Sequence, residues 1–227
     1  MTSRGQSVLQ KSVSDYSKLI YEKGWVANHD GNVSARLADN KRFMATPTAE
    51  SKRLIEPHDN IVVDIAGKRL SGRRRLFSEW HLHAVCYKAR PDANAVIHAH
   101  PVHATALGVT GGSLGTPALP EMVVSLGANI PTLDYALPKS AAQEAALAHA
   151  LNEGDADGVL LAGNGVLVVG VDLEQAFLRL ELIEHYARIL GAASSYGRIQ
   201  PIPAEDLKAL LAKRTAAGLG RAGRQKS

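Results

Sequence analysis

The residue types best suited to chemistry gather in residues 95–101, which read Ala-Val-Ile-His-Ala-His-Pro. This stretch is apolar and ends at a proline, so we predict a buried β-strand. Side chains two positions apart on a strand point to the same face, which places His98 and His100 side by side. Two neighbouring imidazoles on a rigid element can bind a divalent metal ion.

A second polar cluster, residues 78–83, precedes this strand and reads Ser-Glu-Trp-His-Leu-His. Ser78 is a favourable N-cap residue, so we predict a helix over about 79–90. Glu79 and His83 are four residues apart and therefore share one helix face. Glu79 has either a structural role, because the helix dipole favours a carboxylate in the first turn, or a chemical one if the helix meets the strand. We interpret His83 as a hydrogen-bonded structural residue.

The composition indicates a chain with a substantial hydrophobic core. Hydrophobic residues make up 45% of the 227 positions, and no apolar run reaches the roughly 18 residues that cross a bilayer. The N-terminal residues lack the apolar segment of a signal peptide, and the single cysteine, Cys86, cannot form an internal disulfide. We therefore predict a cytoplasmic protein that does not act at a membrane.

The net charge of +4 comes from the C-terminal residues. Residues 213–227 carry five basic residues and no acidic ones; without them, the 26 basic residues fall to 21, against 22 acidic residues. We predict one domain over residues 1–212, followed by a basic, disordered tail over 213–227. Because no recognition motif accompanies the tail, we predict no nucleic acid among the partners.

Helical and β-type segments alternate along the chain without a linker, which indicates one α/β domain with helices on both faces of a sheet. The clearest strands are residues 61–65 and the two halves of 158–170. Asn164-Gly165 separates these two halves and is a strong signal for a hairpin. We predict helices over residues 3–23, 140–151, 172–191 and 203–214.

Four short segments of the chain together are similar to the class II aldolase/adducin family. They are residues 31–34 (Gly-Asn-Val-Ser), 46–48 (Thr-Pro-Thr), 78–80 (Ser-Glu-Trp) and 90–100 (Arg-Pro-Asp-Ala-Asn-Ala-Val-Ile-His-Ala-His). The resemblance runs from about residue 8 to residue 210. It implies a three-layer α/β/α domain with a mixed, mostly antiparallel central sheet. It also implies a homotetramer with active sites between subunits.

The same resemblance implies chemistry and assigns roles to individual residues. Members of the family cleave or form a carbon–carbon bond beside a hydroxyl and a carbonyl, and some epimerise or decarboxylate. His98 and His100 match two ligands of a divalent metal ion, usually zinc. Glu79 matches the carboxylate that completes the site and moves the proton, and Glu121 falls where the family places a second acid/base residue. Three positions match the pocket for the anionic group of the substrate: Asn32, Thr48 and Ser78.

One departure from the family concerns the metal site, because Asn164 stands where a third histidine is expected. An amide oxygen is a poorer zinc ligand than imidazole, whereas harder cations accept oxygen. Three alternatives stay open. His98, His100 and Glu79 hold the metal; or Asn164 assists a weaker site that prefers manganese or iron; or the site is empty and Asn164 is only a hairpin residue.

A second departure concerns the anion pocket. Ala49 follows Thr48 where the family has glycine, and Phe77 takes the place of a hydroxyl residue. These changes argue against a typical sugar phosphate. A carboxylate held by the basic run 73–75, Arg-Arg-Arg, is an alternative, because guanidinium groups bind carboxylates in a bidentate manner.

Together these observations predict a metal-dependent lyase. Its small-molecule substrate would be a hydroxy-carbonyl compound or a hydroxy acid, and the reaction would be aldol cleavage or decarboxylation. One alternative is a catalytically degenerate, adducin-like scaffold, which Asn164 favours. Another is an iron oxygenase with two histidines and one carboxylate, since that ligand set leaves coordination positions open for oxygen.

Overall fold

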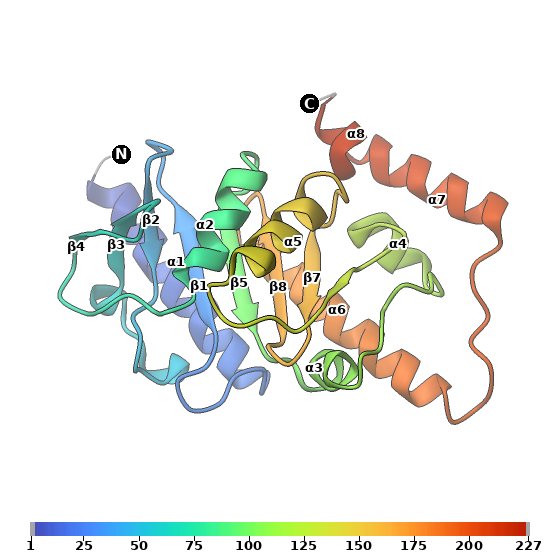
Figure 1. The fold of residues 1–227 in the computed structure, drawn as a ribbon. Helices are drawn as coiled ribbons and strands as arrows, with labels where there is room; N and C mark the ends of the chain where they lie inside the picture. Colours follow the sequence, from blue (N-terminus) through green and yellow to red (C-terminus); the bar gives the residue numbers. More distant parts are fainter. Residues whose placement is uncertain (1–2, 226–227) are drawn as a thin grey trace.

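Short β-rich segments separated by turns pair into one sheet in the computed structural model, which describes residues 3–225. Within these residues the sheet has eight strands in the order β4-β3-β2-β1-β5-β8-β7-β6 (Figure 1). The strands are β1 (Asn32–Arg36), β2 (Arg42–Ala45), β3 (Ile61–Asp64), β4 (Arg69–Ser71), β5 (Ala95–Ala99), β6 (Thr132–Leu133), β7 (Gly158–Leu161) and β8 (Val166–Gly170). β6 pairs with β7 in parallel, and the other pairings are antiparallel.

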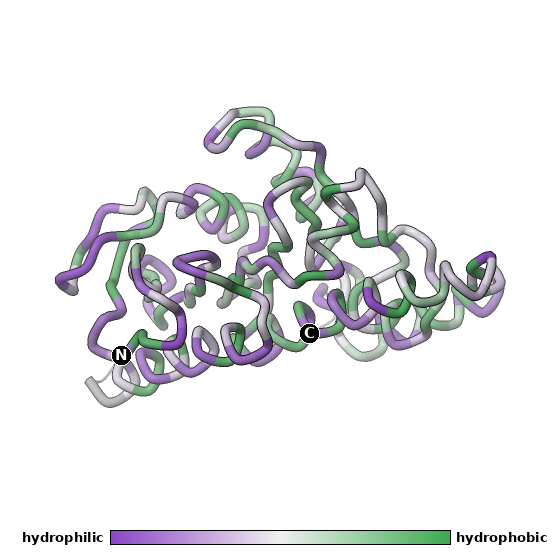
Figure 2. The backbone as a smooth tube through the Cα atoms, turned by 90° about the horizontal axis from the view of Figure 1, so that it is seen from below, coloured by the Kyte–Doolittle hydropathy of each residue, from purple (hydrophilic) through white to green (hydrophobic). Residues whose placement is uncertain are grey.

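Helices cover both faces of this sheet and bury its apolar side chains. They are α1 (Ser3–Glu22), α2 (Trp80–Ala89), α3 (Val102–Val109), α4 (Pro120–Leu126), α5 (Ala141–Leu151), α6 (Leu173–Ala193), α7 (Ala204–Ala216) and α8 (Gly220–Arg224). One core cluster joins the sheet to α1, α3, α4 and α6, and the other joins it to α2 and α5. The turns of α1, beginning at the N label, alternate between hydrophilic and hydrophobic residues, as expected for a helix with one buried face (Figure 2).

The predicted three-layer α/β/α fold with a mostly antiparallel sheet is therefore confirmed. Two of the predicted helices also begin with a side-chain cap: the side chain of Ser140 accepts from the Gln143 amide, and that of Asp172 accepts from the Gln175 amide. The N-cap of α2 is Glu79 rather than the predicted Ser78. Among the helices of residues 3–225, none is both long enough and apolar enough to cross a membrane.

The central strand β5 shows how alternation positions the polar site. Ile97 packs in the core cluster on the α6 side of the sheet, whereas Val96 packs in the cluster on the α2 side. Because successive side chains alternate between faces, His98 points with Val96 toward the face that α2 covers. The strand is thus buried on both faces, which explains why residues 95–99 are apolar apart from this histidine.

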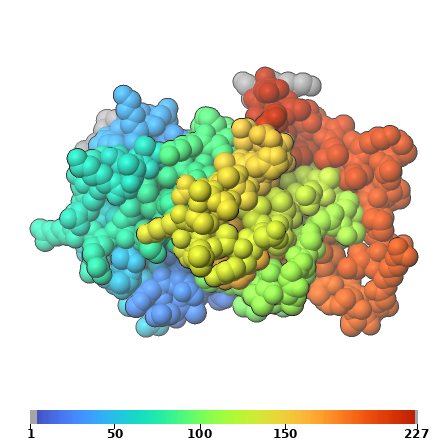
Figure 3. All heavy atoms as spheres, in the orientation of Figure 1, coloured from blue at the N-terminus to red at the C-terminus, as the bar shows by residue number. Residues whose placement is uncertain are grey.

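The structure differs from the prediction of a disordered basic tail after residue 212. Helix α7 continues to Ala216, α8 follows, and the C-terminal segment lies along one side of the molecule against residues near α4 (Figure 3). The guanidinium of Arg214 is buried, with Nη2 2.5 Å from Asp157 Oδ2, and Arg224 Nη2 lies 2.5 Å from Asp155 Oδ1. Arg214 and Arg224 thus attach this segment to Asp157 and Asp155, which belong to a loop distant in the chain. Residues 226–227 of the predicted tail lie outside the described part.

Ala49 stores local backbone strain that a single substitution is expected to release. Its φ of 60° lies in the left-handed region, which costs an L-residue about 1–2 kcal/mol. Glycine adopts this conformation freely but gains entropy in the unfolded chain, so Ala49→Gly is expected to raise the free energy of unfolding by about 0.5–1 kcal/mol. Urea denaturation measures this change. The matched control, Ala146→Gly on the exposed side of α5, is expected to lower the same quantity by about 1 kcal/mol. Destabilisation by both variants would contradict the strain at Ala49.

Candidate functional site

The two polar clusters identified in the sequence meet at the end of β5. His98, which is fully buried, points toward the start of α2. Glu79 is the N-cap of that helix, and its Oε1 atom lies 3.4 Å from His98 Nε2. Packing of α2 against the sheet therefore brings together a carboxylate and an imidazole that are 19 positions apart in the chain.

The imidazoles of His98 and His100 face one another with their Nε2 atoms, which lie 3.3 Å apart. His98 Nδ1 lies 3.0 Å from the backbone carbonyl oxygen of Val166, so this nitrogen carries a proton and donates to it. His100 is partly exposed, and its Nδ1 lies 3.7 Å from Asp30 Oδ2. The orientation of His98 is thus fixed by the neighbouring strand β8, and its Nε2 is directed into the site.

The carboxylate of Glu79 is held on both oxygens. The side-chain amide of Asn32 donates to Oε2 and that of Asn164 donates to Oε1, each at 2.9 Å. Burial alone would raise the pKa of Glu79, but the charge of His98 and these hydrogen bonds outweigh it and hold this pKa well below its usual range. Glu79 is therefore an ionised carboxylate in a fixed orientation at neutral pH.

The β7–β8 hairpin brings Asn164 to this carboxylate. The following residue, Gly165, has a φ of 75°, and a Cβ atom there would lie 2.4 Å from both the Ala99 carbonyl oxygen and His100 Cδ2. Only glycine allows the turn to come this close to the histidines. The predicted Asn-Gly hairpin is confirmed, and its asparagine has a specific contact in the site besides its place in the turn.

A buried row of polar groups continues behind Glu79. Asn32 Oδ1 lies 2.6 Å from His83 Nε2, and His83 Nδ1 lies 2.7 Å from Ser34 Oγ. Ser34 Oγ in turn lies 2.7 Å from the hydroxyl of Tyr87. The interpretation of His83 as a hydrogen-bonded residue is confirmed. Sequence reasoning missed Ser34 and Tyr87, although Ser34 is two residues from Asn32 on one strand and Tyr87 is four residues from His83 on one helix.

A buried lysine joins the two loops that border the site. Lys52 is 1% exposed, and its Nζ atom donates to the backbone carbonyls of His29 and Glu50, each at 3.2 Å. Burial lowers the pKa of Lys52 to about 8, against the opposing effect of nearby carboxylates that include Asp30. Lys52 thereby ties the loop before β1 to the loop after β2. Sequence reasoning missed it, because an isolated lysine in a polar segment is usually exposed.

The three residues predicted for the anion pocket have different contacts. The side-chain amide of Asn32 is engaged by Glu79 and His83, and the backbone N–H of Thr48 donates to the Arg75 carbonyl. Ser78 instead lines a separate cavity of about 460 Å³, which neither Asn32 nor Thr48 lines.

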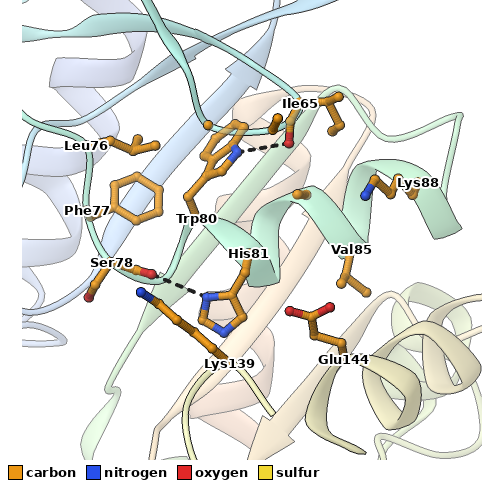
Figure 4. A pocket seen from close by; sticks show the side chains of 13 residues that line it. Ile65, Leu76, Phe77, Ser78, Trp80, His81, Val85, Lys88, Lys139 and Glu144 are labelled. Carbon is orange, nitrogen blue, oxygen red and sulfur yellow. Dashed lines mark hydrogen bonds between the residues drawn. The ribbon is translucent and has the colours of Figure 1, made fainter. Parts of the chain in front are cut away.

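Aromatic and charged side chains surround the cavity at Ser78 (Figure 4). Its lining includes Phe77, Trp80, His81, Lys139 and Glu144. His81 Nδ1 lies 3.3 Å from the Ser78 carbonyl oxygen, a contact within α2 and its cap. His81 thus lines this cavity and is not among the groups that contact the Glu79 carboxylate, as expected from its position two residues along the helix.

Two further predicted groups are absent from the contacts of the Glu79 carboxylate, which within the described residues are with Asn32, Asn164 and His98. Glu121 is exposed in the first turn of α4, and it is not among the groups that contact the Glu79 carboxylate. Within the basic run 73–75, Arg74 forms ion pairs with Glu50 at 2.8 Å and with Asp59 at 3.1 Å. One of the three arginines is therefore already paired with carboxylates of the protein.

The histidine pair fits two positions of a metal site. Two nitrogens bound to one tetrahedral zinc ion at 2.0–2.1 Å lie about 3.3 Å apart, which is the observed separation between the Nε2 atoms of His98 and His100. The hydrogen bond from His98 Nδ1 to a backbone carbonyl is also usual for metal-binding histidines. Across residues 3–225, however, no group of three or more His, Cys, Asp or Glu side chains is arranged to hold a metal ion. The third family position is taken by Asn164, which donates to Glu79.

Comparison with known proteins decides the family. The family model described as Class II Aldolase and Adducin N-terminal domain matches residues 11–190. This chain belongs to the class II aldolase/adducin family. The match covers the whole central sheet and α2, and so includes the elements that bring Glu79, His98 and Asn164 together.

Individual members of the family extend this result. The L-fuculose phosphate aldolase of Escherichia coli (strain K12) is 33% identical over 194 residues, which cover 83% of this chain and 86% of that protein. The 5-deoxy-D-ribulose 1-phosphate aldolase of Bacillus thuringiensis serovar kurstaki is 26% identical over 90% of this chain and 94% of that protein. The crystal structure of YgbL from E. coli, a candidate aldolase/epimerase/decarboxylase, has a TM-score of 0.82 and 25% identity, covering 91% of this chain and 99% of that one. The chain is accordingly a class II aldolase-like lyase, and the predicted enzyme class is confirmed.

Proposed function

We propose that this class II aldolase-like protein is a metal-dependent lyase. It cleaves a carbon–carbon bond of a hydroxy-carbonyl or hydroxy-acid substrate, by aldol cleavage or decarboxylation. The observation that carries the proposal is the ionised Glu79 carboxylate, held by two amides and 3.4 Å from His98 Nε2, beside a pair of facing imidazoles. A scaffold would have no use for three buried or part-buried ionisable groups in contact, because each is costly to desolvate.

In this proposal His98 and His100 hold a divalent cation, with Glu79 as the third ligand. Zinc is the first choice because of the imidazole ligands, and manganese or iron are alternatives if the oxygen of Asn164 assists. When bound, the cation polarises the adjacent hydroxyl and carbonyl oxygens of the substrate as a Lewis acid. The hydrogen bond from His98 Nδ1 to Val166 keeps Nε2 directed at this position.

Glu79 supplies the proton transfer in the proposed reaction. Its carboxylate takes the proton of the substrate hydroxyl when the neighbouring carbon–carbon bond breaks, and it returns the proton to the product carbon. The amides of Asn32 and Asn164 fix both oxygens, so the carboxylate keeps one orientation. Its low pKa means that it is ionised, and therefore able to accept a proton, throughout the neutral range.

Glu121 is proposed as a second acid/base group that acts from a neighbouring subunit. It is exposed in the first turn of α4 and is not among the groups that contact the Glu79 carboxylate. A homotetramer with active sites between subunits would bring Glu121 of one copy to Glu79 of another. This arrangement accounts for an acidic side chain in the first turn of α4 that has no role within its own subunit in the proposed reaction.

The substrate is proposed to differ from a typical sugar phosphate. Ala49 occupies a left-handed turn position beside Thr48, and the bulky ring of Phe77 is buried against His83, where the family has a hydroxyl. The side-chain amide of Asn32 is already engaged on both of its atoms. Each of these features changes or engages a position that, by resemblance to the family, would contribute to a phosphate site. Because two relatives are named as aldolases of sugar phosphates, any assay must include sugar phosphates for comparison.

Metal content is the experiment that tests the proposal. Mass spectrometry of untagged protein purified without chelators is expected to find about one divalent metal ion per chain. The ion is expected to be lost in the His98→Ala/His100→Ala double variant. Asn164→His adds a third imidazole and is expected to strengthen zinc binding by about tenfold or more. Gln200→His adds a histidine to the surface and is the matched control, with unchanged metal content.

The outcomes separate the alternatives. A native protein without metal, combined with one zinc per chain in Asn164→His, would overturn the metal-dependent reaction and favour a scaffold. Where metal is present, turnover of hydroxy acids and of sugar 1-phosphates is compared by kcat/KM. Higher kcat/KM for the sugar phosphates would overturn the substrate proposal but not the lyase. Oxygen consumption with ferrous iron would favour the oxygenase alternative.

A further inference from the structure

We propose that His83 is a positioning residue, which acts on Glu79 through the side chain of Asn32. The proposal rests on the proposed role of Glu79 in proton transfer. His83 does not contact Glu79 itself: its Nε2 atom lies 2.6 Å from Asn32 Oδ1, and Asn32 Nδ2 lies 2.9 Å from Glu79 Oε2. Nothing in the proposed reaction requires an imidazole at this place, so its function must lie in the group it holds.

The donors and acceptors of this row can be arranged in only one direction. An ionised carboxylate only accepts hydrogen bonds, so Asn32 must present its nitrogen to Glu79 and its oxygen to His83. His83 Nε2 must then carry the proton, because two acceptors would otherwise face each other at 2.6 Å. Glu79 therefore determines which tautomer His83 adopts, and that tautomer in turn holds the amide of Asn32 in place.

The hydrogen bonds of Ser34 and Tyr87 run in the same direction, toward Glu79. With the proton on Nε2, His83 Nδ1 is an acceptor, and the hydroxyl of Ser34 donates to it at 2.7 Å. The oxygen of Ser34 is then free to accept from the hydroxyl of Tyr87, also at 2.7 Å. A row in which every member donates toward the carboxylate is polarised along its length, and each bond strengthens the next.

The surroundings of His83 restrict it to the neutral form. The ring is fully buried, with the ring of Phe77 at a centroid distance of 4.9 Å and that of Trp80 stacked at 6.0 Å. Burial is the main cause that lowers the pKa of His83 to about 3. Phe77 thus has a function of its own, since the bulky ring that departs from the family pattern is one wall of the compartment that keeps this imidazole neutral.

Loss of His83 would release Asn32 rather than Glu79. Without a donor at Nε2, the oxygen of Asn32 loses its buried hydrogen-bond partner, and the side chain is no longer fixed at both ends. The hydrogen bond from Asn32 to Glu79 is then less constrained, whereas the hydrogen bond from Asn164 and the contact with His98 are unchanged. We expect the position of Glu79 to become less defined, which affects the chemical step more than substrate binding.

Two variants of the full-length, metal-loaded protein test this mechanism. His83→Leu removes the donor and keeps a similar volume, and it is expected to lower kcat about 10- to 100-fold with KM changed less than about threefold. His83→Gln keeps an N–H group near the place of Nε2 and is expected to recover at least about tenfold of that loss. His58→Leu, at an exposed histidine outside the site, is the control with unchanged kinetics.

A spectroscopic measurement decides the tautomer independently of turnover. In ¹⁵N-histidine-labelled protein, the His83 signal, assigned by its absence from His83→Gln, is expected to show a neutral ring with the proton on Nε2. A proton on Nδ1, or a cationic ring at neutral pH, would overturn the proposal even if the protein is a lyase. Equal losses of kcat in His83→Leu and His83→Gln, accompanied by equal falls in melting temperature, would also overturn it in favour of a purely structural role. If the native protein turns over no substrate, the proposed function is wrong. The ¹⁵N measurement still tests the tautomer of His83 in that case, because it does not depend on turnover.

Discussion

Replacing Glu79 with glutamine is expected to lower kcat by about two to four orders of magnitude, the usual contribution of a positioned general base. Glutamine has nearly the same shape as glutamate but cannot accept a proton at neutral pH. It also has only one oxygen, so one of the two amide donors, Asn32 or Asn164, would face another N–H group. The chemical step and the orientation of the side chain are therefore affected together.

Steady-state kinetics checks this expectation, with whichever of the tested hydroxy acids and sugar 1-phosphates is turned over best. Circular dichroism checks the fold. The side chain of Glu79 is about one-quarter exposed, so the folded state is expected to survive the change. Glu153→Gln, which changes an exposed carboxylate on the α5 side, is the matched control and should leave kcat unchanged. If Glu79→Gln keeps more than about a tenth of the native kcat, a group other than Glu79 must transfer the proton.

The second large effect is on stability, at the buried carboxylate of Asp157. Asp157 has a fully buried side chain that contacts three guanidinium groups within 3.0 Å: those of Arg90, Arg179 and Arg214. Removing one partner of a buried ion pair typically costs about 3–5 kcal/mol, because the other charge stays desolvated. Asp157→Asn is therefore expected to lower the free energy of unfolding by about that amount.

Differential scanning calorimetry measures this loss as a fall of roughly 6–20 °C in melting temperature. The matched control is Asp15→Asn, which removes one partner of an exposed ion pair with Lys11. Exposed pairs contribute at most about 1 kcal/mol, so this control should change little. Similar effects of the two substitutions would contradict the structural importance of the buried cluster, and with it the anchoring of α7 through Arg214.

The same carboxylate makes stability depend on acid pH. Burial raises the pKa of Asp157, but Arg179, Arg90 and Arg214 outweigh it and hold this pKa below the usual value. A carboxylate with a lowered pKa in the folded state contributes stability that is complete above the unfolded pKa of about 4. This contribution is lost as the pH falls from there through the folded pKa. Native protein should therefore lose stability below about pH 4, and Asp157→Asn should lack this part of the loss.

The sequence determined the elements and the faces on which their polar residues lie. Alternation along residues 95–101 placed His98 and His100 on one face of a strand, and helical spacing placed Glu79 and His83 on one face of a helix. The Asn164-Gly165 turn and the helix that begins after Asp172 were also predicted and are present. These features follow from the local chain, because side-chain period, turn residues and helix caps depend on neighbours within a few positions.

Only the tertiary structure decided which of these groups meet and what each one does. The amide nitrogen of Asn164 donates to Glu79, a contact that the hairpin sequence alone does not reveal. Arg214 and Arg224, which follow position 212, form ion pairs with Asp157 and Asp155 from a loop about 60 residues earlier. Lys52 is buried although lysine is usually exposed. In each case the sequence shows the charge or the amide but not its partner, because ion pairs and hydrogen bonds across a sheet depend on packing between elements distant in the chain.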